Sequence, residues 1–204
     1  GRGALTFGVT TAQVFTRSRE GLAAPDLQLL FTPASYALGQ FGVLEDKPGM
    51  TCAICPVKPD SRGTVMAKSA DPFEKPAIRP NYLAAPEDAR KLAAGIRQVR
   101  EIFRQPAITP YTVEEILPGP GITSDAELLA FNRQYGTTIY HPVGTCRMGE
   151  DPASVVDSRL RLRGVTGLRV ADASVMPTLT TGNTNAPSIM IGEKCAQMVL
   201  EDAR

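Results

Sequence analysis

The sequence predicts an α+β fold, in which an antiparallel sheet with helices is followed by a C-terminal strand and helix of α/β type. Three observations predict it. Short apolar runs bounded by Gly and Pro fill much of the first 120 positions, and two amphipathic helix patterns lie between positions 86 and 135. The last part of the chain alternates polar loops with one short strand and one helix. Short strands with tight connections are typical of antiparallel sheets.

The composition is that of an ordinary globular protein. Of the 204 residues, 43% are hydrophobic and 21% are charged, which excludes wholesale disorder. A net charge of +1 gives no basic field to collect phosphates, so nucleic acid is not expected as a partner. No apolar stretch reaches the roughly 18–20 residues that a membrane span needs. The chain opens Gly1-Arg2-Gly3 without an initiator Met or a signal-peptide pattern, which indicates a processed, nicked or truncated product.

The four cysteines do not form the framework of a disulfide-rich domain in a chain of this length. Cys52 and Cys55 form a CxxC pattern, but no second CxxC and no nearby histidine could complete a zinc site, so no metal site is expected. We interpret the pair as two small apolar residues of a strand, with a redox pair as the alternative. Free thiols favour a cytoplasmic location.

Four segments of the first part are expected to be extended. Runs of β-forming residues occupy 26–31, 50–57 and 63–67, and Ser61-Arg62-Gly63 is a turn signal before the third run. Asp71-Pro72 then breaks the chain, and 77–82 resumes an extended path through Pro80.

Two helices are expected next. Over 86–105, an apolar stripe recurs at helical spacing, and charged residues form a face that we expect to be solvated. The stripe consists of Leu92, Ile96, Val99 and Phe103, and the charged face of Lys91, Arg97, Arg100 and Glu101. A second helix opens at Ser124 and Asp125, with Glu127 at the third position of a capping box, and runs to about Tyr135.

The character of the chain changes after Gly136. A loop rich in small residues occupies 141–149, a short strand over 167–171 ends at Asp172, and a polar loop covers 180–185. A last helix is expected from Pro187 to about Asp202, because proline is favourable in a first turn. Loop, strand, loop and helix in this order are typical of a cofactor-binding α/β unit.

The candidate catalytic residues lie in these two loops. His141 is the only histidine of the chain, and histidine is the natural general base at neutral pH. Asn183 both donates and accepts, so it can hold a hydroxyl beside a base. Asp172 and Ala173 offer a carboxylate for a sugar hydroxyl and a backbone N–H for a phosphate. The alternatives are a structural histidine, a Gly182-Asn183 turn and an ordinary Asp at a strand end.

Taken together, these segments resemble the C-terminal half of the glucose–methanol–choline (GMC) family of FAD-dependent oxidoreductases. The specific matches are His141-Pro-Val-Gly-Thr-Cys-Arg-Met-Gly149, 156–157, 164–177, Gly182-Asn-Thr-Asn185 and Ile191-Gly-Glu-Lys194. Segments 25–28, 61–63, 69–72 and 80–83 resemble the substrate domain of that family in the same order. The resemblance covers nearly the whole chain and is most specific after residue 140.

The resemblance implies a catalytic role for two residues and a place in the substrate pocket for a third. His141 corresponds to the histidine that takes the hydroxyl proton of the alcohol while a hydride passes to the flavin. Asn183 corresponds to the residue that hydrogen-bonds the substrate oxygen, and Tyr140 would line the substrate pocket. The implied reaction is oxidation of an alcohol to an aldehyde or ketone.

The resemblance also implies contacts to FAD. Asp172 and Ala173 correspond to the pair that contacts the ribityl and pyrophosphate groups. Thr184 and Asn185 correspond to residues near the pyrimidine end of the flavin ring. The positive end of the helix that begins near Ala186 and Pro187 would stabilise the negative charge that develops there, by roughly 0.3–1 kcal/mol.

The resemblance divides the chain into two parts. Residues 1–135 correspond to part of a substrate-binding domain, and 136–204 to the closing strand and helix of a Rossmann-like FAD-binding domain that carries the catalytic loops. The Gly-x-Gly-x-x-Gly motif that seats the ADP moiety in this family does not occur in the sequence. We therefore expect a second polypeptide to supply the N-terminal, ADP-binding half and most contacts to FAD.

Two other functions remain open at this point. Some relatives of this fold are lyases that cleave cyanohydrins and keep FAD only as a structural group. A non-catalytic fragment without flavin is the second alternative. A Ser-His-Asp hydrolase is not expected, because the sequence has no Gly-x-Ser-x-Gly motif.

Overall fold

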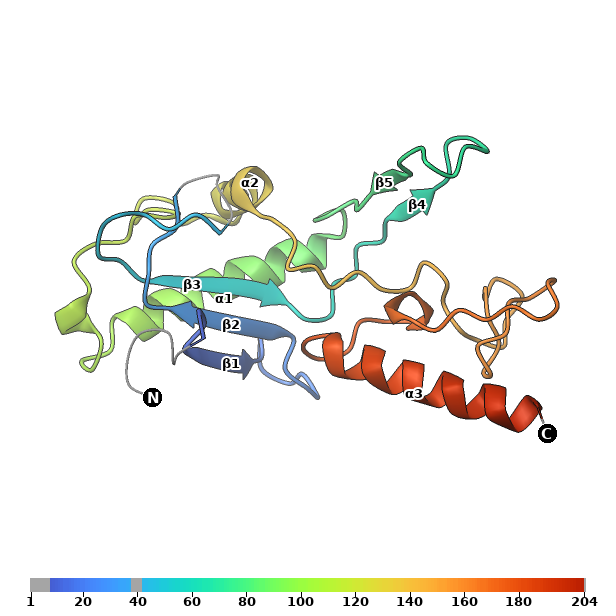
Figure 1. Cartoon of the computed structure of the whole chain (residues 1–204). Helices are drawn as coiled ribbons and strands as arrows, with labels where there is room; N and C mark the ends of the chain where they lie inside the picture. Colours follow the sequence, from blue (N-terminus) through green and yellow to red (C-terminus); the bar gives the residue numbers. More distant parts are fainter. Residues whose placement is uncertain (1–7, 38–41, 204) are drawn as a thin grey trace. The chain divides into compact units, whose positions relative to one another are not determined.

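The computed structural model describes residues 8–37 and 42–203, so the opening Gly1-Arg2-Gly3 lies outside the described residues. Its backbone contacts divide the chain into two compact units, whose elements are labelled in Figure 1. Unit 1 comprises Gly1–Ser61 and Leu83–Thr137, and unit 2 comprises Arg62–Tyr82 and Thr138–Arg204. The segment 62–82 thus belongs to the same unit as the C-terminal part. The assignment of 1–135 and 136–204 to a substrate domain and an FAD domain stays a prediction.

Unit 1 is built on a three-stranded antiparallel sheet in the order β1-β2-β3. Its strands are β1 (Ala12–Thr16), β2 (Leu27–Thr32) and β3 (Thr51–Pro56). The sequence predicts β2 and β3 within one residue at each end, because both are apolar runs. It misses β1, whose residues are nearly all exposed and carry no apolar alternation.

Two helices belong to unit 1, and α1 (Pro86–Phe103) runs along the sheet (Figure 1), in contact with β2 and β3. Gly95 makes this close approach possible, since a Cβ atom there would lie 2.5 Å from Cγ2 of Ile54 in β3. The second helix, α2 (Asp125–Tyr135), packs against α1. The buried residues of this cluster are Ala93, Ile96 and Leu128.

The capping box of α2 is confirmed. Ser124 Oγ accepts from the backbone N–H of Glu127 at 3.3 Å, and Glu127 Oε2 accepts from the backbone N–H of Ser124 at 3.0 Å. Each interaction satisfies a donor that the helix itself leaves unpaired.

Two residues of the face of α1 that was expected to be solvated are not. The side chain of Arg100 is largely buried and pairs with Glu115 at 2.8 Å. Lys91 is buried, and its Nζ donates to the carbonyl oxygen of Lys58 at 2.8 Å and to Asp60 at 3.1 Å. Asp88 lies one turn before it, also buried, and its oxygen is 3.7 Å from the same Nζ. A buried charge is tolerated when it is paired and hydrogen-bonded, and the helical spacing alone gave no sign of these partners.

The two cysteines of the CxxC pattern lie in β3 and are free thiols. Burial raises the pKa of Cys52 to about 11 and that of Cys55 to about 11. Since the thiolate is the reactive form, neither residue has the properties of a redox cysteine. Their interpretation as small apolar residues of a strand is confirmed.

Unit 2 consists mainly of loops held by a small core. It contains the hairpin of β4 (Thr64–Met66) and β5 (Ala77–Arg79), the long helix α3 (Asn185–Asp202) and the short 3-10 helix η3 (Ala173–Val175). A further 3-10 turn, η2 (Thr109–Tyr111), belongs to unit 1. The buried residues of the unit 2 core are Val156, Leu160, Val175, Met176 and Ile191.

Two expectations for unit 2 differ in detail from the structure. Segment 167–171 pairs only through an isolated bridge between Arg161 and Arg169, because the left-handed Gly164 and Gly167 turn the chain back too soon for a longer ladder. The last helix begins at Asn185, two residues before Pro187. Proline is tolerated there because its missing N–H would lie among the unpaired donors of a first turn.

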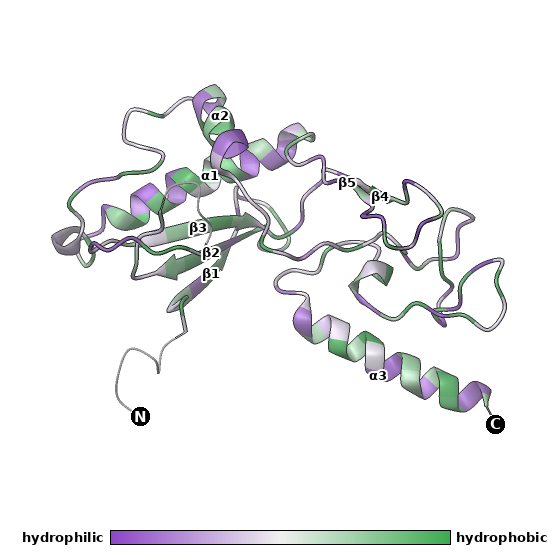
Figure 2. Ribbon diagram, turned by 45° about the horizontal axis from the view of Figure 1, so that its top comes forward, coloured by the Kyte–Doolittle hydropathy of each residue, from purple (hydrophilic) through white to green (hydrophobic). Residues whose placement is uncertain are grey.

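Helix α3 carries hydrophobic residues along its length (Figure 2). Ile191, Cys195 and Met198 face the core of unit 2. Other apolar side chains of the helix are exposed within the described chain, with Ile189 at 66% and Leu200 at 65%. No helix of the described residues is long and apolar enough to cross a membrane.

Candidate active site

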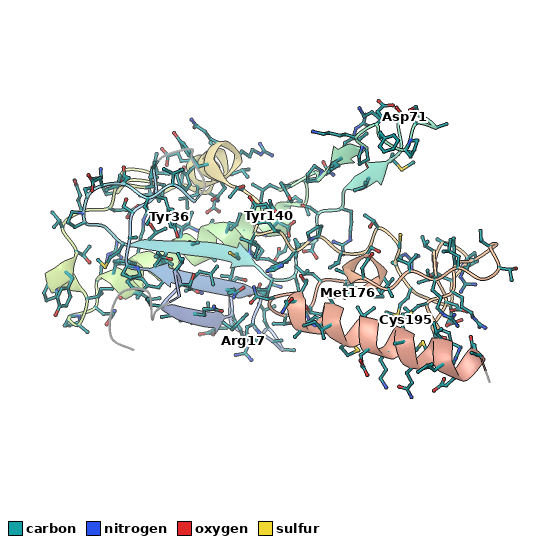
Figure 3. All side chains as sticks on the ribbon, in the orientation of Figure 1. Arg17, Tyr36, Asp71, Tyr140, Met176 and Cys195 are labelled. Carbon is teal, nitrogen blue, oxygen red and sulfur yellow. The ribbon has the colours of Figure 1, made fainter. Side chains whose placement is uncertain are left out.

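The loop that carries His141 follows α2 and lies at the start of the C-terminal segment of unit 2. Tyr140, labelled in Figure 3, precedes the histidine in the left-handed region, with φ of 63°. Its backbone N–H donates to Thr138 Oγ1 at 2.9 Å. Left-handed backbone in a bulky residue is uncommon and marks positions that the surrounding structure constrains. This turn therefore fixes the direction in which the loop presents His141.

The other end of the His141 loop is attached to η3. The backbone N–H of Cys146 donates to Ser174 O at 3.0 Å, and that of Met148 donates to Val175 O at 2.8 Å. Val175 and Met176 are buried in the core of unit 2, and Figure 3 labels Met176 together with Cys195 of α3. The core thus holds the loop beside the segment that contains Asp172 and Ala173.

The structure brings His141 together with Asn183 and Thr184, although 42 and 43 positions separate them along the chain. Asn183 Nδ2 lies 2.9 Å from His141 Nε2, and Thr184 Oγ1 lies 2.9 Å from His141 Nδ1. An amide nitrogen can only donate, so a hydrogen bond from Asn183 Nδ2 requires an unprotonated Nε2 and places the hydrogen on Nδ1. The two contacts thus favour one tautomer of the neutral imidazole, with the Nε2 lone pair directed at Asn183.

The start of α3 determines where Asn183 and Thr184 lie. Gly182 has φ of 121°, a conformation that favours glycine, and it turns the chain immediately before Asn183. Thr184 is the N-cap residue of α3 and is buried. Its carbonyl oxygen accepts from the backbone N–H and the hydroxyl of Ser188, at 3.0 and 2.7 Å. The helix thereby anchors the residue that contacts the imidazole.

Asp172 and Ala173 lie in the same unit but make no hydrogen bond to the His141 group among the described residues. Asp172 Oδ1 accepts from the backbone N–H of Ser174 at 2.7 Å, which caps η3. The side chain is exposed, and its Oδ2 accepts no hydrogen bond in the part of the chain that the structure describes. One carboxylate oxygen is thus available to a ligand.

Tyr140 and Asn185 are exposed. Tyr140 has 63% of its surface accessible and lies directly beside His141 in the chain. Asn185 is the first residue of α3, next to Thr184. Both positions are compatible with contact to a bound molecule, and the roles that the sequence predicts for them stay predictions.

Two features of the site escape sequence reasoning. The first is the contact of the Thr184 hydroxyl with the imidazole, for which a Thr next to an Asn gives no signal. The second is Thr180, whose Oγ1 is buried without a hydrogen-bond partner in the described chain. Buried hydroxyl groups are nearly always paired, so an unpaired one beside a candidate site suggests a group that binds there.

A cavity of about 360 Å³ lies elsewhere in unit 2, around the loop 161–169 and the end of α3. Arg161 is paired with Asp157 at 2.8 Å, and Arg169 is paired with Asp202. The pair of Arg169 and Asp202 joins the loop to the end of α3, and the cavity contains none of the candidate catalytic residues. Among the described residues, no group of His, Cys, Asp and Glu could hold a metal ion.

Comparison with known proteins gives close relatives. An alcohol dehydrogenase [acceptor] from Pseudomonas putida is 46% identical over 199 residues, which cover 98% of this chain and 36% of the relative. An oxygen-dependent choline dehydrogenase from Escherichia coli is 43% identical over 185 residues, which cover 91% of this chain and 33% of the relative. The chain therefore spans about a third of the length of the curated relatives that it matches.

Solved structures agree with these relatives. Pyridoxine 4-oxidase from Mesorbium loti superposes with a TM-score of 0.83 at 29% identity, over 93% of this chain and 37% of the oxidase. A formate oxidase from Aspergillus oryzae gives a TM-score of 0.78 at 31% identity, over 89% of this chain and 32% of the oxidase. The model of the GMC oxidoreductase family matches residues 59–192, well over half of the chain. The chain belongs to the GMC oxidoreductase family, and it corresponds to the C-terminal region of that family.

Proposed function

We propose that this chain carries the proton-accepting part of an enzyme that oxidises an alcohol to an aldehyde or ketone. The single observation that supports this most is the contact of His141 Nε2 with Asn183 Nδ2 at 2.9 Å. It places a basic nitrogen beside a hydrogen-bond donor, and the helix start and the anchored loop hold both. FAD is the cofactor that family membership indicates. Two curated relatives are named as dehydrogenases of an alcohol and of choline.

The described residues of unit 2 fit such a cofactor. The buried hydroxyl of Thr180 lacks a partner, at a cost of about 1–3 kcal/mol that a bound polar group would offset. Asp172 Oδ2 is available to a ribityl hydroxyl, and Ala173 is small enough for close approach of its backbone. The first N–H groups of α3, next to Thr184 and Asn185, have no partners within the helix and form the positive end of its dipole. These groups would face the pyrimidine end of the ring.

The proposed proton transfer runs to Nε2 of His141. The hydroxyl of the alcohol takes the place of Asn183 Nδ2 at this nitrogen and donates its hydrogen to the lone pair. Nε2 accepts the proton, so that the substrate oxygen becomes an alkoxide and the ring becomes an imidazolium. Positioned general base catalysis of this kind contributes roughly 10²–10⁴-fold to a rate.

Asn183 would then donate to the substrate oxygen. Its amide hydrogen supports the negative charge of the alkoxide, and the imidazolium at His141 adds electrostatic stabilisation. When bound, FAD supplies the acceptor for the hydride that leaves the α-carbon of the alcohol. The carbonyl product forms as this carbon loses the hydride, and the proton stays on His141.

We further propose that another region, supplied by a second polypeptide, provides the ADP-binding part. The relatives extend well beyond the part that this chain matches, since 36% and 33% of their lengths are covered. The exposed apolar face of α3, with Ile189 and Leu200, offers a surface for that region. Intact-mass analysis of the native protein with its absorption spectrum tests this: a second chain and a flavin are expected. A single, flavin-free chain would contradict the proposal.

The function itself is tested by anaerobic addition of alcohols to the native, flavin-containing protein. We expect the visible flavin band to bleach with at least one of choline, pyridoxine and benzyl alcohol, because the α-carbon hydride reduces the ring. Glu150 is an exposed residue directly after the loop 141–149 that carries His141. The variant Glu150→Gln serves as a control and should leave the bleaching of the flavin unchanged. Product formation from a cyanohydrin with unchanged flavin would instead identify a lyase and refute the proposal.

A further inference from the structure

Thr184 stands at a position where a threonine hydroxyl normally serves the helix. N-cap hydroxyl groups usually accept a hydrogen bond from the backbone N–H of the second or third helical residue. Ser124 does this at the start of α2. At the start of α3 the third residue is Pro187, which has no N–H, and the Thr184 side chain makes no capping hydrogen bond. The helix therefore leaves this hydroxyl to another partner.

That partner is the imidazole. Thr184 Oγ1 lies 2.9 Å from His141 Nδ1, and Thr184 is only 7% exposed, so water cannot readily replace the contact. On the opposite side of the ring, Asn183 Nδ2 approaches Nε2 at the same distance. The two contacts are complementary: the amide donates to Nε2, and the hydroxyl oxygen accepts from Nδ1–H.

We propose that Thr184 is a positioning residue that selects the tautomer of His141 and holds its ring in place. This inference rests on the proposed function, in which Nε2 is the proton acceptor. Without the hydroxyl, the neutral ring could carry its hydrogen on either nitrogen, and the fraction with hydrogen on Nε2 could not act as a base there. A partner on the second ring nitrogen commonly decides which nitrogen is protonated.

The same contact also supports the charged ring. After Nε2 has taken the substrate proton, Nδ1–H becomes part of an imidazolium, and its hydrogen bond to Thr184 Oγ1 becomes charge-assisted. No atom has to move for this change. Thr184 therefore favours both the correct starting tautomer and the product of the proton transfer, while it touches neither the proton nor the substrate.

The direct test is the nitrogen-15 NMR spectrum of the native, flavin-containing protein, labelled at histidine, at a pH at which imidazole is neutral. His141 is the only histidine of this chain, and subtraction of the His141→Asn spectrum removes signals from any histidine elsewhere. We expect the shift of a protonated nitrogen at Nδ1 and of an unprotonated one at Nε2. The reverse assignment, or an even mixture, would overturn the proposal without any variant of Thr184.

Two variants distinguish a role of the Thr184 hydroxyl in positioning the imidazole from a role of the side chain in packing. Thr184→Val keeps the shape but removes the hydroxyl, and it should give mixed tautomers and a flavin reduction rate about 3- to 10-fold lower, as expected for one hydrogen bond. Thr184→Ser should restore the single tautomer and come within about 2-fold of the original rate. Thr178→Val, an exposed threonine of the same unit, is the matched control and should change neither measurement.

The results distinguish this inference from the proposed function. If Thr184→Val keeps the original tautomer and rate, or Thr184→Ser fails to restore them, Thr184 is not the positioning residue. If no alcohol reduces the flavin but Thr184→Val still mixes the tautomers, the positioning role stands and the alcohol oxidation fails. A shift of tautomer thus reports on Thr184 independently of activity.

Discussion

Two polar clusters, one in each unit, differ in how far their groups are paired within the protein. In unit 1, the buried Asp88 accepts from the backbone N–H groups of Asp60 and Ser61 at 2.8 and 2.9 Å, and Lys91 lies beside it. All of these polar groups are therefore paired with other groups of unit 1. In unit 2, the groups around His141 lie partly at the surface, and the buried Thr180 Oγ1, three positions before Asn183, has no hydrogen-bond partner in the described chain.

This difference separates a structural cluster from a candidate active site. Buried charges whose hydrogen bonds are all made within the protein hold α1 against the segment 58–61, and they offer nothing to a ligand. Partly exposed groups held by a rigid surrounding can exchange one protein contact for a substrate contact, as Asn183 would at His141 Nε2. The contrast also agrees with the general location of function on loops that a scaffold positions.

The largest effect that we expect is on the rate of flavin reduction, when the candidate base in unit 2 is removed. His141→Ala should lower the rate of anaerobic flavin reduction in the native, flavin-containing protein by about 10²–10⁴-fold, because the general base is lost. Bound flavin and amide hydrogen exchange in unit 1 should stay as they are, since both hydrogen bonds of this side chain in the described part of the chain go to unit 2 residues. Stopped-flow absorbance measures the rate. Reduction at the original rate would show that His141 is not the base.

The next largest effect is expected on the stability of unit 1, when a side chain of its core is truncated. Leu128 is fully buried between α2 and α1, so Leu128→Ala should lower the free energy of unfolding of unit 1 by about 2–5 kcal/mol. Hydrogen exchange of α1 and α2 peptides measures it. Val113→Ala is the matched control, because Val113 is 99% exposed and should change stability by less than about 0.5 kcal/mol. Equal effects of the two variants would contradict the core assignment.

The Asp88 cluster should make unit 1 sensitive to acid. Burial tends to raise the pKa of Asp88, but hydrogen bonds from Ser61 and Asp60 and the charge of Lys91 outweigh it and lower the pKa below its usual value. A lowered folded pKa means that the stabilisation is present at neutral pH and is lost as the pH falls through that pKa.

Asp88→Asn should therefore cost about 1–3 kcal/mol at neutral pH, the cost of disturbing a buried charged hydrogen-bond partner. It should also flatten the decline of α1 protection in acid, as measured by hydrogen exchange against pH. The exposed Asp125, which pairs with Arg97, gives the matched variant Asp125→Asn, for which we expect little change. If the protection of α1 falls in acid to the same extent in Asp88→Asn as in the original protein, this carboxylate does not cause the acid sensitivity.

The smallest effect that we expect is on the stability of unit 1, where a gain in helix propensity and a cost of overpacking oppose each other. Gly95→Ala would gain about 1 kcal/mol of helix propensity, but its Cβ would lie 2.5 Å from Ile54 Cγ2 and 3.3 Å from Leu27 Cδ1. Overpacking of this kind costs about 1–3 kcal/mol, so we expect a net loss of up to about 2 kcal/mol in thermal or denaturant unfolding. Gly121→Ala, with no atom within 4 Å, should be close to neutral. A stabilised Gly95→Ala would show that α1 lies farther from the sheet.

Periodicity predicted the regular elements of unit 1 because burial leaves a repeating pattern. The stripe of α1 and the capping box of Ser124 and Glu127 are local signals, and both helices end within two residues of expectation. β1 lacks such a pattern, since its residues are exposed and its place comes from pairing with β2. The burial of Lys91 likewise depends on a carbonyl group 33 positions away.

Unit 2 required a different kind of evidence. No local rule links His141 to a loop 42 positions later, and only the resemblance of both motifs to one family predicted that they act together. The structure brings them into contact, whereas the contact of Thr184 with the imidazole depends on where α3 begins. That start lies two residues before the expected one, because Pro187 was assigned to the first helical position instead of the third.

The most direct test of the paired loops is a double-mutant cycle on anaerobic flavin reduction. It uses the His141→Ala, Asn183→Ala and double variants of the native, flavin-containing protein. Contacting residues that serve one step do not act additively. Asn183→Ala alone should slow reduction by about 10-fold, as expected for a hydrogen bond to a charged oxygen, and by less than about 2-fold when His141 is already Ala. The same factor in both backgrounds would contradict the claim that the two side chains handle one substrate oxygen together.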